Sequence, residues 1–325
     1  MNIAIIGCGL IGQKRLNAFE AHCLTYAVDT DEKRAMQLAL TRPEAKVSTN
    51  WKDVLQDKNT EAVIVATTND ALAEITLSAV QEGKHVLVEK PAARFSEELD
   101  PIIREASKKN IKVKVGFNHR YHPAIMKARE IVDAGGIGPL MYLRAAYGHG
   151  GRIGYDKEWR ASKEKAGGGE LLDQGMHLID LSRWFLGEFT EVDGFAHTYF
   201  WKMAVEDNGF ALLKTHDKKV AWLHASCSEW KNGFSMEIYG KKGKLHITGL
   251  GGSYGVEKLA WYRMLPEMGP PETTLYEYPF PDKSWQLELA DFVDAIKNDR
   301  AVMSGLEETR DALRIVEKIY KGSSK

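Results

Sequence analysis

Asp173 and His177 are the two residues whose types and spacing most directly suggest acid–base chemistry. They stand four positions apart in a helix predicted over 170–186, so their side chains share one helix face. A carboxylate beside an imidazole can form half of a metal site, or it can assist proton transfer. Because no further His or Cys lies at a convincing metal-ligand spacing, we predict proton transfer and no metal.

Lys90 is the third candidate for chemistry. It follows a predicted parallel strand over 85–88, and ligands of open α/β sheets bind outside the carboxyl ends of the strands. Pro91 restricts the backbone beside it, which favours a positioned amine over an ordinary surface lysine. Such an amine can polarise a substrate oxygen or relay its proton, so either Lys90 or His177 can be the principal base.

A glycine-rich loop near the N-terminus predicts a dinucleotide site. It follows an apolar strand directly and opens a helix, and this context makes the pattern G-x-G-x-x-G specific. The first glycine permits a tight turn, the second lets backbone approach a pyrophosphate, and the third lets the helix pack closely on the sheet. The helix N-terminus then offers free N–H groups to the phosphates. The predicted cofactor contacts in this loop are Gly7, Gly9, Leu10, Ile11 and Gly12.

Asp29 predicts which dinucleotide binds. It ends the second predicted strand, where a carboxylate can accept hydrogen bonds from the adenosine ribose hydroxyls. A 2′-phosphate would meet a like charge there, so we predict NAD, with NADP less favoured. Arg34 is close in sequence, and we interpret it as a solvated residue on the next helix.

The basic and aromatic segment 152–165 is a candidate substrate-binding loop. An aromatic face can stack on a sugar ring, and arginine suits a carboxylate or a phosphate group. A solvated basic loop around one buried tryptophan fits the same residues equally well. The candidate substrate residues in this segment are Arg152, Tyr155, Trp159 and Arg160.

Composition argues against several functional classes. The chain has 44 Lys and Arg against 45 Asp and Glu, so a net charge of -1 offers no field for a polyanion and we expect no nucleic-acid partner. Its three cysteines are too few and too scattered for a disulfide framework or a Cys-rich zinc site. No apolar run reaches the roughly 18 residues of a membrane span. We therefore expect a cytoplasmic protein with no membrane partner.

Residues 1–120 show the alternation of a parallel α/β domain. Short, near-continuous apolar runs alternate with amphipathic stretches, which indicates a doubly wound parallel sheet with helices on both faces, the Rossmann architecture. The predicted strands are 3–6, 25–28, 62–66, 85–88 and 113–117, and the predicted helices are 12–21, 31–40, 71–82 and 96–109.

Residues 121–325 have a different character and form a predicted α+β domain for substrate binding and oligomerisation. After a helix at 123–134, long alternating segments indicate a large, mostly antiparallel open sheet, interrupted by the helix at 170–186. We expect 266–281 to be a loop, and two helices within 285–321 to pack back toward the Rossmann domain. The predicted strands are 141–147, 191–200, 209–215, 221–228, 234–239 and 245–248.

Three motifs resemble the Gfo/Idh/MocA family of oxidoreductases, and the resemblance covers nearly the whole chain. They are Glu89-Lys90-Pro91, the stretch GFNHRY at 116–121, and GGGELLDQGMHLID at 167–180. The last is the most specific, because family members place a glycine run before an Asp-x-Gly-x-His core. The family's usual Thr-Pro-Asn-x-x-His appears at 67–72 as TTNDAL, so we expect the cofactor contacts of this loop to differ.

The resemblance implies a Rossmann domain followed by an α/β domain whose open sheet often makes oligomer contacts. It implies that Lys90, Asp173 and His177 face the nicotinamide and the substrate. It also adds candidates at corresponding positions: Thr67, Thr68, Asn69, Glu89, Lys90 and Asn118 for the cofactor, and Arg120 and His122 for the substrate.

These features together predict hydride transfer between NAD and a hydroxyl or keto carbon of a sugar or sugar derivative. In this hypothesis His177 removes the hydroxyl proton, Lys90 hydrogen-bonds the same oxygen, and Asp173 orients the pair. The basic substrate segment favours a sugar that carries an anionic group, and a nucleotide-linked sugar would qualify.

Two other functional classes fit the same sequence. An NAD-dependent glycosidase would oxidise a ring hydroxyl transiently, eliminate the leaving group and reduce the ring again, with no net NADH. A non-catalytic NAD-binding regulator would be expected to lack Lys90 or His177, and both are present.

Aromatic residues of the second domain predict self-association. An exposed sheet face needs a partner to cover it, so we expect a homodimer or a homotetramer. Most of these residues should lie in the core or in a subunit interface: Phe195, Tyr199, Phe200, Trp201, Trp222, Trp230 and Tyr239.

Overall fold

The computed structural model describes residues 1–267 and 269–323, which divide into two units. Unit 1 contains Met1–Phe117, Glu164–Gly167 and Trp285–Asp311, and unit 2 contains Asn118–Lys163, Gly168–Ser284 and the C-terminal segment from Ala312. Two short segments, 164–167 and 285–311, therefore group with unit 1, although the sequence-based division at 120/121 assigns them to the second domain. The last two residues of that predicted domain, 324 and 325, lie outside the described part of the chain.

Unit 1 is built on a six-stranded parallel sheet in the order β3-β2-β1-β4-β5-β6. This order confirms the predicted Rossmann sheet, in which the strand order reverses between β1 and β4. The inner strands β1, β4 and β5 are almost wholly buried, as expected of strands covered on both faces. The strands are β1 (Asn2–Ile6), β2 (Cys23–Val28), β3 (Lys46–Ser48), β4 (Ala62–Val65), β5 (His85–Glu89) and β6 (Val113–Gly116).

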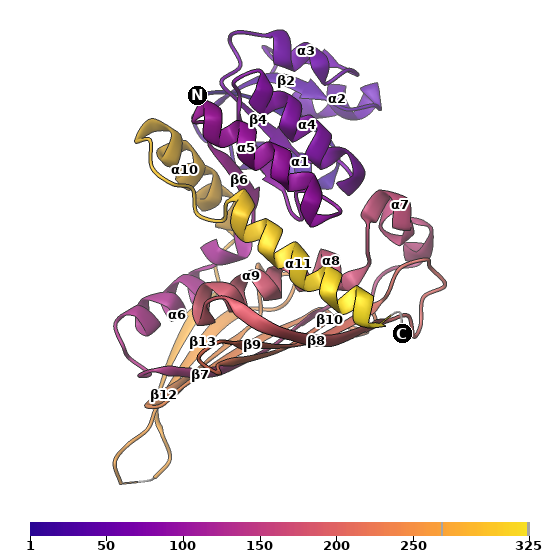
Figure 1. Ribbon diagram of the computed structural model, residues 1–325. Helices are drawn as coiled ribbons and strands as arrows, with labels where there is room; N and C mark the ends of the chain where they lie inside the picture. Colours follow the sequence, from indigo (N-terminus) through magenta and orange to yellow (C-terminus); the bar gives the residue numbers. More distant parts are fainter. Residues whose placement is uncertain (268, 324–325) are drawn as a thin grey trace. The chain divides into compact units, whose positions relative to one another are not determined.

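Local signals place the helices of unit 1. Helix α2 begins after Asp31, whose carboxylate accepts a hydrogen bond from the Lys33 N–H at 3.0 Å. Helix α5 carries Pro101 in its first turn and ends at Asn110, which adopts the left-handed conformation with φ 53. The helices are α1 (Leu10–Asn17), α2 (Glu32–Ala39), α3 (Lys52–Gln56), α4 (Asn69–Gln81), α5 (Asp100–Lys109) and α10 (Ser284–Lys297), all labelled in Figure 1.

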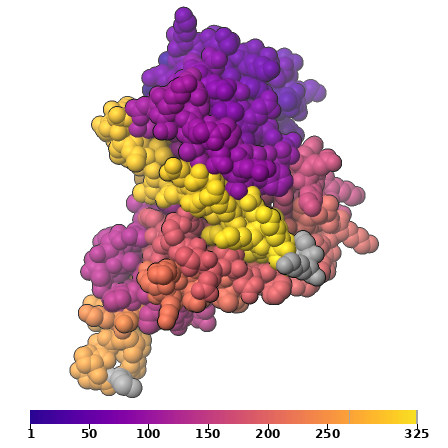
Figure 2. Space-filling model, in the orientation of Figure 1, coloured from indigo at the N-terminus to yellow at the C-terminus, as the bar shows by residue number. Residues whose placement is uncertain are grey.

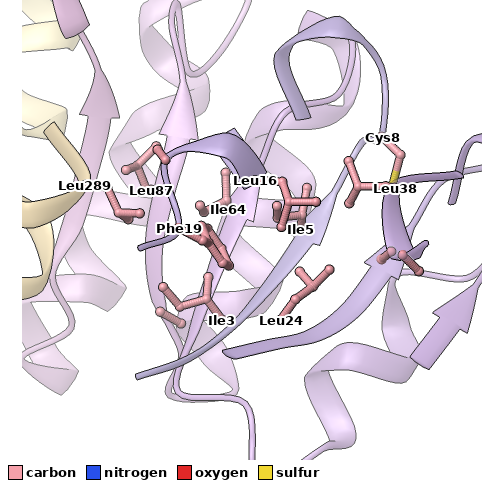
Figure 3. Packing of buried hydrophobic residues seen from close by; sticks show 14 of the residues in the cluster. Ile3, Ile5, Cys8, Leu16, Phe19, Leu24, Leu38, Ile64, Leu87 and Leu289 are labelled. Carbon is pink, nitrogen blue, oxygen red and sulfur yellow. The ribbon is translucent and has the colours of Figure 1, made fainter. Parts of the chain in front are cut away.

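The hydrophobic core of unit 1 explains why α10 belongs to it. Figure 3 shows Leu289 of α10 beside Leu87 of β5, in the same cluster as Ile5 and Leu16. Phe292, one turn further along α10, is also fully buried in this cluster. Burying a side chain of this kind contributes roughly 1.5–3 kcal/mol, so the late segment is part of the first fold.

A buried charge cluster also links α10 to the sheet. Arg15 of α1 bonds Glu89 at the end of β5 through its Nε, at 2.6 Å, and Glu288 of α10 through Nη1, at 2.6 Å. The side chains of Arg15 and Glu288 are 0% exposed. Since a buried charge is costly without its partner, each member of this cluster requires the other two.

Unit 2 is built on an eight-stranded sheet in the order β14-β13-β12-β11-β7-β10-β9-β8. Only β7 and β10 pair in parallel among its described strands, which confirms the predicted, mostly antiparallel sheet. The strands are β7 (Leu140–Gly148), β8 (Phe189–His197), β9 (Asn208–Thr215), β10 (Val220–Ser226), β11 (Gly233–Gly240), β12 (Gly243–Thr248), β13 (Glu257–Arg263) and β14 (Glu272–Tyr278).

Helices lie along one face of this sheet. Figure 1 shows α6 (Pro123–Asp133), α8 (Glu170–Asp173) and α9 (Gly175–Leu186) on the same side of the strands. Side chains alternate accordingly: in β10, Ala221 and Leu223 are buried, whereas Trp222 between them is exposed. No helix of the described residues is drawn along the opposite face, so the sheet is open there, as predicted.

Three sequence-based boundaries need correction. The predicted loop at 266–281 contains strand β14, which pairs with β13, because an alternating Thr/Leu/Tyr pattern lies between the flanking prolines. Figure 2 shows the β13–β14 hairpin extending beyond the rest of unit 2. The predicted strand 191–200 ends at His197, since the backbone after it bonds Asp207 instead of a neighbouring strand. The predicted helix 170–186 divides at Gln174 into α8 and α9.

We predict that Glu288→Ala destabilises the protein by about 3–5 kcal/mol, because it leaves the Arg15 charge buried with one partner fewer. Urea unfolding followed by circular dichroism measures the change. Asp294→Ala is the matched control on the same helix, since Asp294 pairs with Arg300 at the surface and such pairs contribute about 0–1 kcal/mol. Equal unfolding curves for the two variants would contradict the prediction.

Candidate functional site

The glycine loop has the geometry of a phosphate-binding turn. Gly7 adopts φ +97, and a Cβ there would lie 2.4 Å from the Ala66 carbonyl oxygen. A Cβ at Gly12 would lie 2.1 Å from the Gly7 carbonyl oxygen, so these two positions admit only glycine. Gly9 differs, because no atom lies within 4 Å of a Cβ built there. The open space over Gly9 adjoins the N-terminus of α1, where a pyrophosphate can meet free N–H groups.

Asp29 lies beside this loop at the end of β2. Its Oδ2 accepts the Cys8 N–H at 2.8 Å, and its Oδ1 accepts the Asp31 N–H at 2.9 Å. These bonds fix the carboxylate where the ribose of a dinucleotide would lie on a Rossmann sheet. Burial, together with the charge of Asp29, raises the pKa of the Cys8 thiol to about 12, so the thiol is neutral at physiological pH.

The loop at 67–69 lies at the same edge of the sheet. Thr67 neighbours the glycine loop, since a Cβ at Gly7 would be 2.8 Å from the Thr67 nitrogen. Thr68 precedes the first residue of α4. The buried Asn69 side chain donates to the Ala166 carbonyl at 2.9 Å, so its amide holds segment 164–167 to unit 1. Asn69 keeps the asparagine of the family pattern, whereas Thr68 and Leu72 stand where the pattern has proline and histidine.

Glu89 and Lys90 lie at the same carboxyl edge of the sheet, at the end of β5. β1, β4 and β5 are parallel neighbours, with Ile6 opposite Val65 and Val65 opposite Val88, so their carboxyl ends are aligned. Lys90 follows β5 there, and its peptide bond to Pro91 is cis. Glu89 is buried and forms an ion pair with Arg15. This ion pair holds the end of β5, next to Lys90, in place.

Asp173 and His177 lie in unit 2, at the end of α8 and in the first turn of α9. Both helices pack on β10, and His177 is buried. The His177 ring stands edge-on to the ring of His119, with centroids 3.6 Å apart. Asp173 accepts a hydrogen bond from the Arg160 Nε at 3.2 Å. The structure therefore brings Arg160, a predicted substrate residue, onto Asp173, a predicted catalytic one.

Glu170 and His149 join this cluster, although neither was singled out from the sequence. The buried Glu170 carboxylate lies 3.2 Å from His149 Nε2 and 3.4 Å from the Tyr155 hydroxyl. Burial acts to lower the pKa of His149, but the hydrogen bond and charge of Glu170 outweigh it, so this pKa is raised. His149 directly follows strand β7, and a polar residue at a strand end is the signal that could have revealed it.

Tyr147 and Tyr254 are two aromatic residues near the His119–His177 ring pair. Tyr147 of β7 lies 5.2 Å from His119 and 5.0 Å from Tyr254, centroid to centroid. Burial raises the pKa of Tyr147 well above its usual value, and Tyr254 adds to the effect, so the phenol stays neutral. A neutral phenol can donate or accept a hydrogen bond beside the imidazoles.

Three other predicted site residues bond to side chains of unit 2. Arg120 donates two hydrogen bonds to Asp180, at 2.8 and 2.6 Å, and both side chains are buried. His122 lies 3.0 Å from Glu257, again with both side chains buried, and Asn118 donates to Ser284 Oγ at 2.9 Å. These groups have protein partners, and their contact with a substrate or cofactor stays a prediction.

The charges of the candidate substrate loop are also paired. Arg152 bonds Glu158 at 2.7 Å, and Arg160 lies over the Trp159 ring at 4.6 Å while it bonds Asp173. Tyr155 is buried against Glu170. The loop is therefore polar and aromatic, with its arginine charges balanced by acidic residues.

Comparison with known proteins agrees with this geometry. Residues 1–117 match the model described as an oxidoreductase family with an NAD-binding Rossmann fold, and residues 125–246 match the GFO/IDH/MocA C-terminal domain. The chain belongs to the Gfo/Idh/MocA family of oxidoreductases. This membership confirms the resemblance carried by the three motifs.

Curated relatives within the family are named dehydrogenases. The levoglucosan dehydrogenase of Pseudarthrobacter phenanthrenivorans is 28% identical over 235 residues, which cover 66% of this chain and 58% of that protein. The scyllo-inositol 2-dehydrogenase (NAD(+)) of Bacillus subtilis is 24% identical over 316 residues, covering 91% and 87%. The match to the first of these spans less than two thirds of its length.

Solved structures share the fold over the whole chain. A levoglucosan dehydrogenase in complex with NADH and levoglucosan has a TM-score of 0.89 at 23% identity and covers 100% of this chain and 97% of its own. An NAD binding oxidoreductase from Klebsiella pneumoniae has a TM-score of 0.88 at 22% identity, with coverages of 100% and 97%. These similarities confirm the predicted fold class.

Within 1–267 and 269–323, no group of three or more His, Cys, Asp or Glu side chains is placed to hold a metal ion. Within the same ranges, no helix is long and apolar enough to cross a membrane.

We predict that Gly9→Ala weakens NADH binding at least about tenfold while urea unfolding stays unchanged. The new methyl group meets no protein atom, and Gly9 has a φ of -70 that alanine tolerates, so the added carbon fills only the space left for a pyrophosphate. Fluorescence titration with NADH measures the affinity. Gly12→Ala is the contrasting variant, because it should lose stability, and wild-type affinity in Gly9→Ala would contradict the assignment.

Proposed function

We propose that the chain is an NAD-dependent dehydrogenase that oxidises a CH–OH group of a sugar or sugar derivative. The observation that carries the proposal is the half-buried ion pair of Asp173 with Arg160, together with the buried His177 ring in contact with His119, in a chain whose glycine loop leaves open space over Gly9. When bound, NAD+ accepts a hydride at the nicotinamide C4. The alcohol then loses one hydride and one proton, which yields a carbonyl compound, NADH and a proton.

His177 is the proposed acceptor of the hydroxyl proton. An imidazole buried among the rings of His119 and Tyr147 is held in one orientation, which favours directed proton transfer. Asp173 is the proposed orienting group, and its bond to Arg160 balances its charge. Lys90 is proposed to hydrogen-bond the substrate oxygen, from its position at the carboxyl edge of the Rossmann sheet.

A neutral sugar or polyol is the substrate class that the charges favour. Arg160 and Arg152 are already bonded to Asp173 and Glu158, so an anionic group would have to displace a carboxylate. The relatives named above act on levoglucosan and scyllo-inositol, which carry no charge. An anionic or nucleotide-linked sugar stays the second substrate class, with the exposed Arg152 as its contact.

Net NADH production separates this proposal from the two other classes. The wild-type protein is incubated with NAD+ or NADP+ and a panel of sugars, polyols, uronates and nucleotide sugars. A dehydrogenase accumulates NADH with its substrate, whereas a glycosidase releases an aglycone without net NADH. A regulator without catalytic activity would bind NADH and turn over none of the panel.

We predict that His177→Ala and Lys90→Ala each lower kcat by about 10²–10⁴, the usual contribution of a positioned acid or base. Steady-state NADH formation on the substrate found in the panel gives the rates. His216→Ala, an exposed histidine in the turn after β9, is the control and should keep wild-type kcat. Full kcat in both His177→Ala and Lys90→Ala would refute the assigned roles.

We further propose that the open face of the unit 2 sheet is covered by a second copy of the chain. Phe195, Leu212 and Trp222 are exposed on neighbouring strands of this face, where Trp222 pairs with Leu212 and Phe195 with Phe210. A contiguous apolar patch of this kind usually marks an interface. A homodimer or homotetramer would bury it.

We expect light scattering to give a dimer or tetramer mass for the wild-type protein and a monomer mass for Leu212→Glu combined with Trp222→Glu. Two charges in the apolar patch would have to be desolvated without partners. Leu40→Glu, at an exposed leucine of unit 1, is the control and should keep the wild-type mass. A monomeric wild-type protein would disprove the interface.

A further inference from the structure

We propose that Tyr155, Trp201, Phe200 and Trp230 form an aromatic row that binds a second pyranose ring, attached to the ring that is oxidised. This inference rests on the proposed function and extends it to disaccharides or other glycosides. It concerns residues that the sequence analysis assigned to the core, a subunit interface or the substrate loop.

Ring geometry makes these four side chains a continuous row. The Tyr155 and Trp201 centroids are 5.7 Å apart, those of Trp201 and Phe200 are 5.1 Å apart, and those of Phe200 and Trp230 are 4.6 Å apart. Phe200 stands nearly perpendicular to both tryptophans, at 85° and 87°. The Tyr155 ring is tilted by 51° from the Trp201 ring, so neighbouring rings along the row differ in orientation.

Exposure rises steadily along the row. Tyr155 is 4% exposed, Trp201 is half-buried, Phe200 is 52% exposed and Trp230 is 69% exposed. Phe200 and Trp230 are therefore exposed in the single chain and are not core residues, and the subunit interface stays the other predicted place for them. Large exposed aromatic surfaces on a soluble protein commonly mark binding sites.

Backbone hydrogen bonds fix the loop that carries Phe200 and Trp201. The Asp207 carboxylate accepts three successive backbone N–H groups, from Tyr199 at 2.9 Å, Phe200 at 2.7 Å and Trp201 at 2.9 Å. The Trp201 indole N–H donates to the Cys227 carbonyl at 2.9 Å. A loop fixed in this way presents its rings without a large ordering cost when a ligand binds.

Trp230 carries backbone strain as well. Its φ of 59 is left-handed, a conformation that a bulky residue rarely adopts. Strain of this type concentrates at ligand clamps and active sites, where the surrounding structure maintains it. The ring of this strained residue contacts Phe200, so Trp230 is the last ring of the row.

The buried end of the row reaches the proposed reaction groups of unit 2. Tyr155 packs edge-on against His149, with centroids 5.5 Å apart, and its hydroxyl lies 3.4 Å from Glu170. Glu170 begins the same short helix that ends at Asp173. The row therefore runs from the exposed Trp230 to the buried cluster that contains Glu170.

A pyranose ring fits this surface better than an ion or a nucleotide phosphate. The row offers ring faces, and Arg152, which lies 5.9 Å from the Tyr155 ring, is bonded to Glu158. Apolar C–H faces of a sugar can stack on such rings while its hydroxyl groups stay in water. The proposed ligand is thus a neutral glycoside.

Calorimetric titration of the NAD+-loaded enzyme with glucose, maltose, cellobiose and gentiobiose tests the proposal. We expect at least one disaccharide to bind about tenfold more tightly than glucose. Trp230→Ala and Phe200→Ala should each remove about tenfold of the disaccharide affinity and leave glucose binding unchanged. Phe280→Ala, at an aromatic residue that is 74% exposed in the segment after β14, is the control and should change neither.

Several results would overturn the proposal. Equal affinity of every disaccharide and glucose would do so, as would equal losses for both sugars in Trp230→Ala. A change of oligomer mass in Trp230→Ala would show that a second copy covers the row. Failure of the proposed function would give a different result. In that case no sugar would yield NADH, even if disaccharides bound to the aromatic row.

Discussion

The close approach of β1 and β4 at Gly7 is the constraint on which the nucleotide-binding half of the chain depends. A side chain at Gly7 would collide with the Ala66 carbonyl, 2.4 Å from its Cβ, so the ends of these two paired strands require glycine at this position. Since β5 continues the parallel order, the same edge receives Thr67 and Lys90. Arg15 lies on the helix that starts at the glycine loop. It bonds Glu89, the residue before Lys90, and so connects this helix to the end of β5.

Unit 2 pairs acidic and basic groups that are partly or wholly buried. Glu170 and Asp173 lie one helical turn apart, and each has a basic neighbour, His149 for the first and Arg160 for the second. Paired charges of this kind avoid the desolvation cost of an isolated carboxylate. Arg152 and Arg160, the arginines of the candidate substrate loop, likewise have carboxylate partners.

Much of the fold was predictable because it depends on local pattern. Buried runs such as Ile3–Ile6 and the alternation of Trp222 with Ala221 report directly on parallel and antiparallel sheets. The short strand β3 lacks such a run, and β14 lies between prolines that are typical of a loop. Neither strand was predicted. The catalytic candidates came from a motif, but the partner of Arg120 is Asp180, sixty residues away, and no local pattern reveals it. Glu170 lies inside the motif, but only the folded structure shows that it is buried against His149 and Tyr155.

Hydride transfer from a carbinol carbon is the central claim, and isotope transfer tests it most directly. The enzyme is incubated with NAD+ and the carbon-deuterated form of its sugar substrate, and the reduced cofactor is analysed by mass spectrometry. The account predicts NADH that carries one deuterium at the nicotinamide C4. Reduced cofactor without deuterium, or no reduced cofactor with any deuterated sugar or polyol, would contradict it.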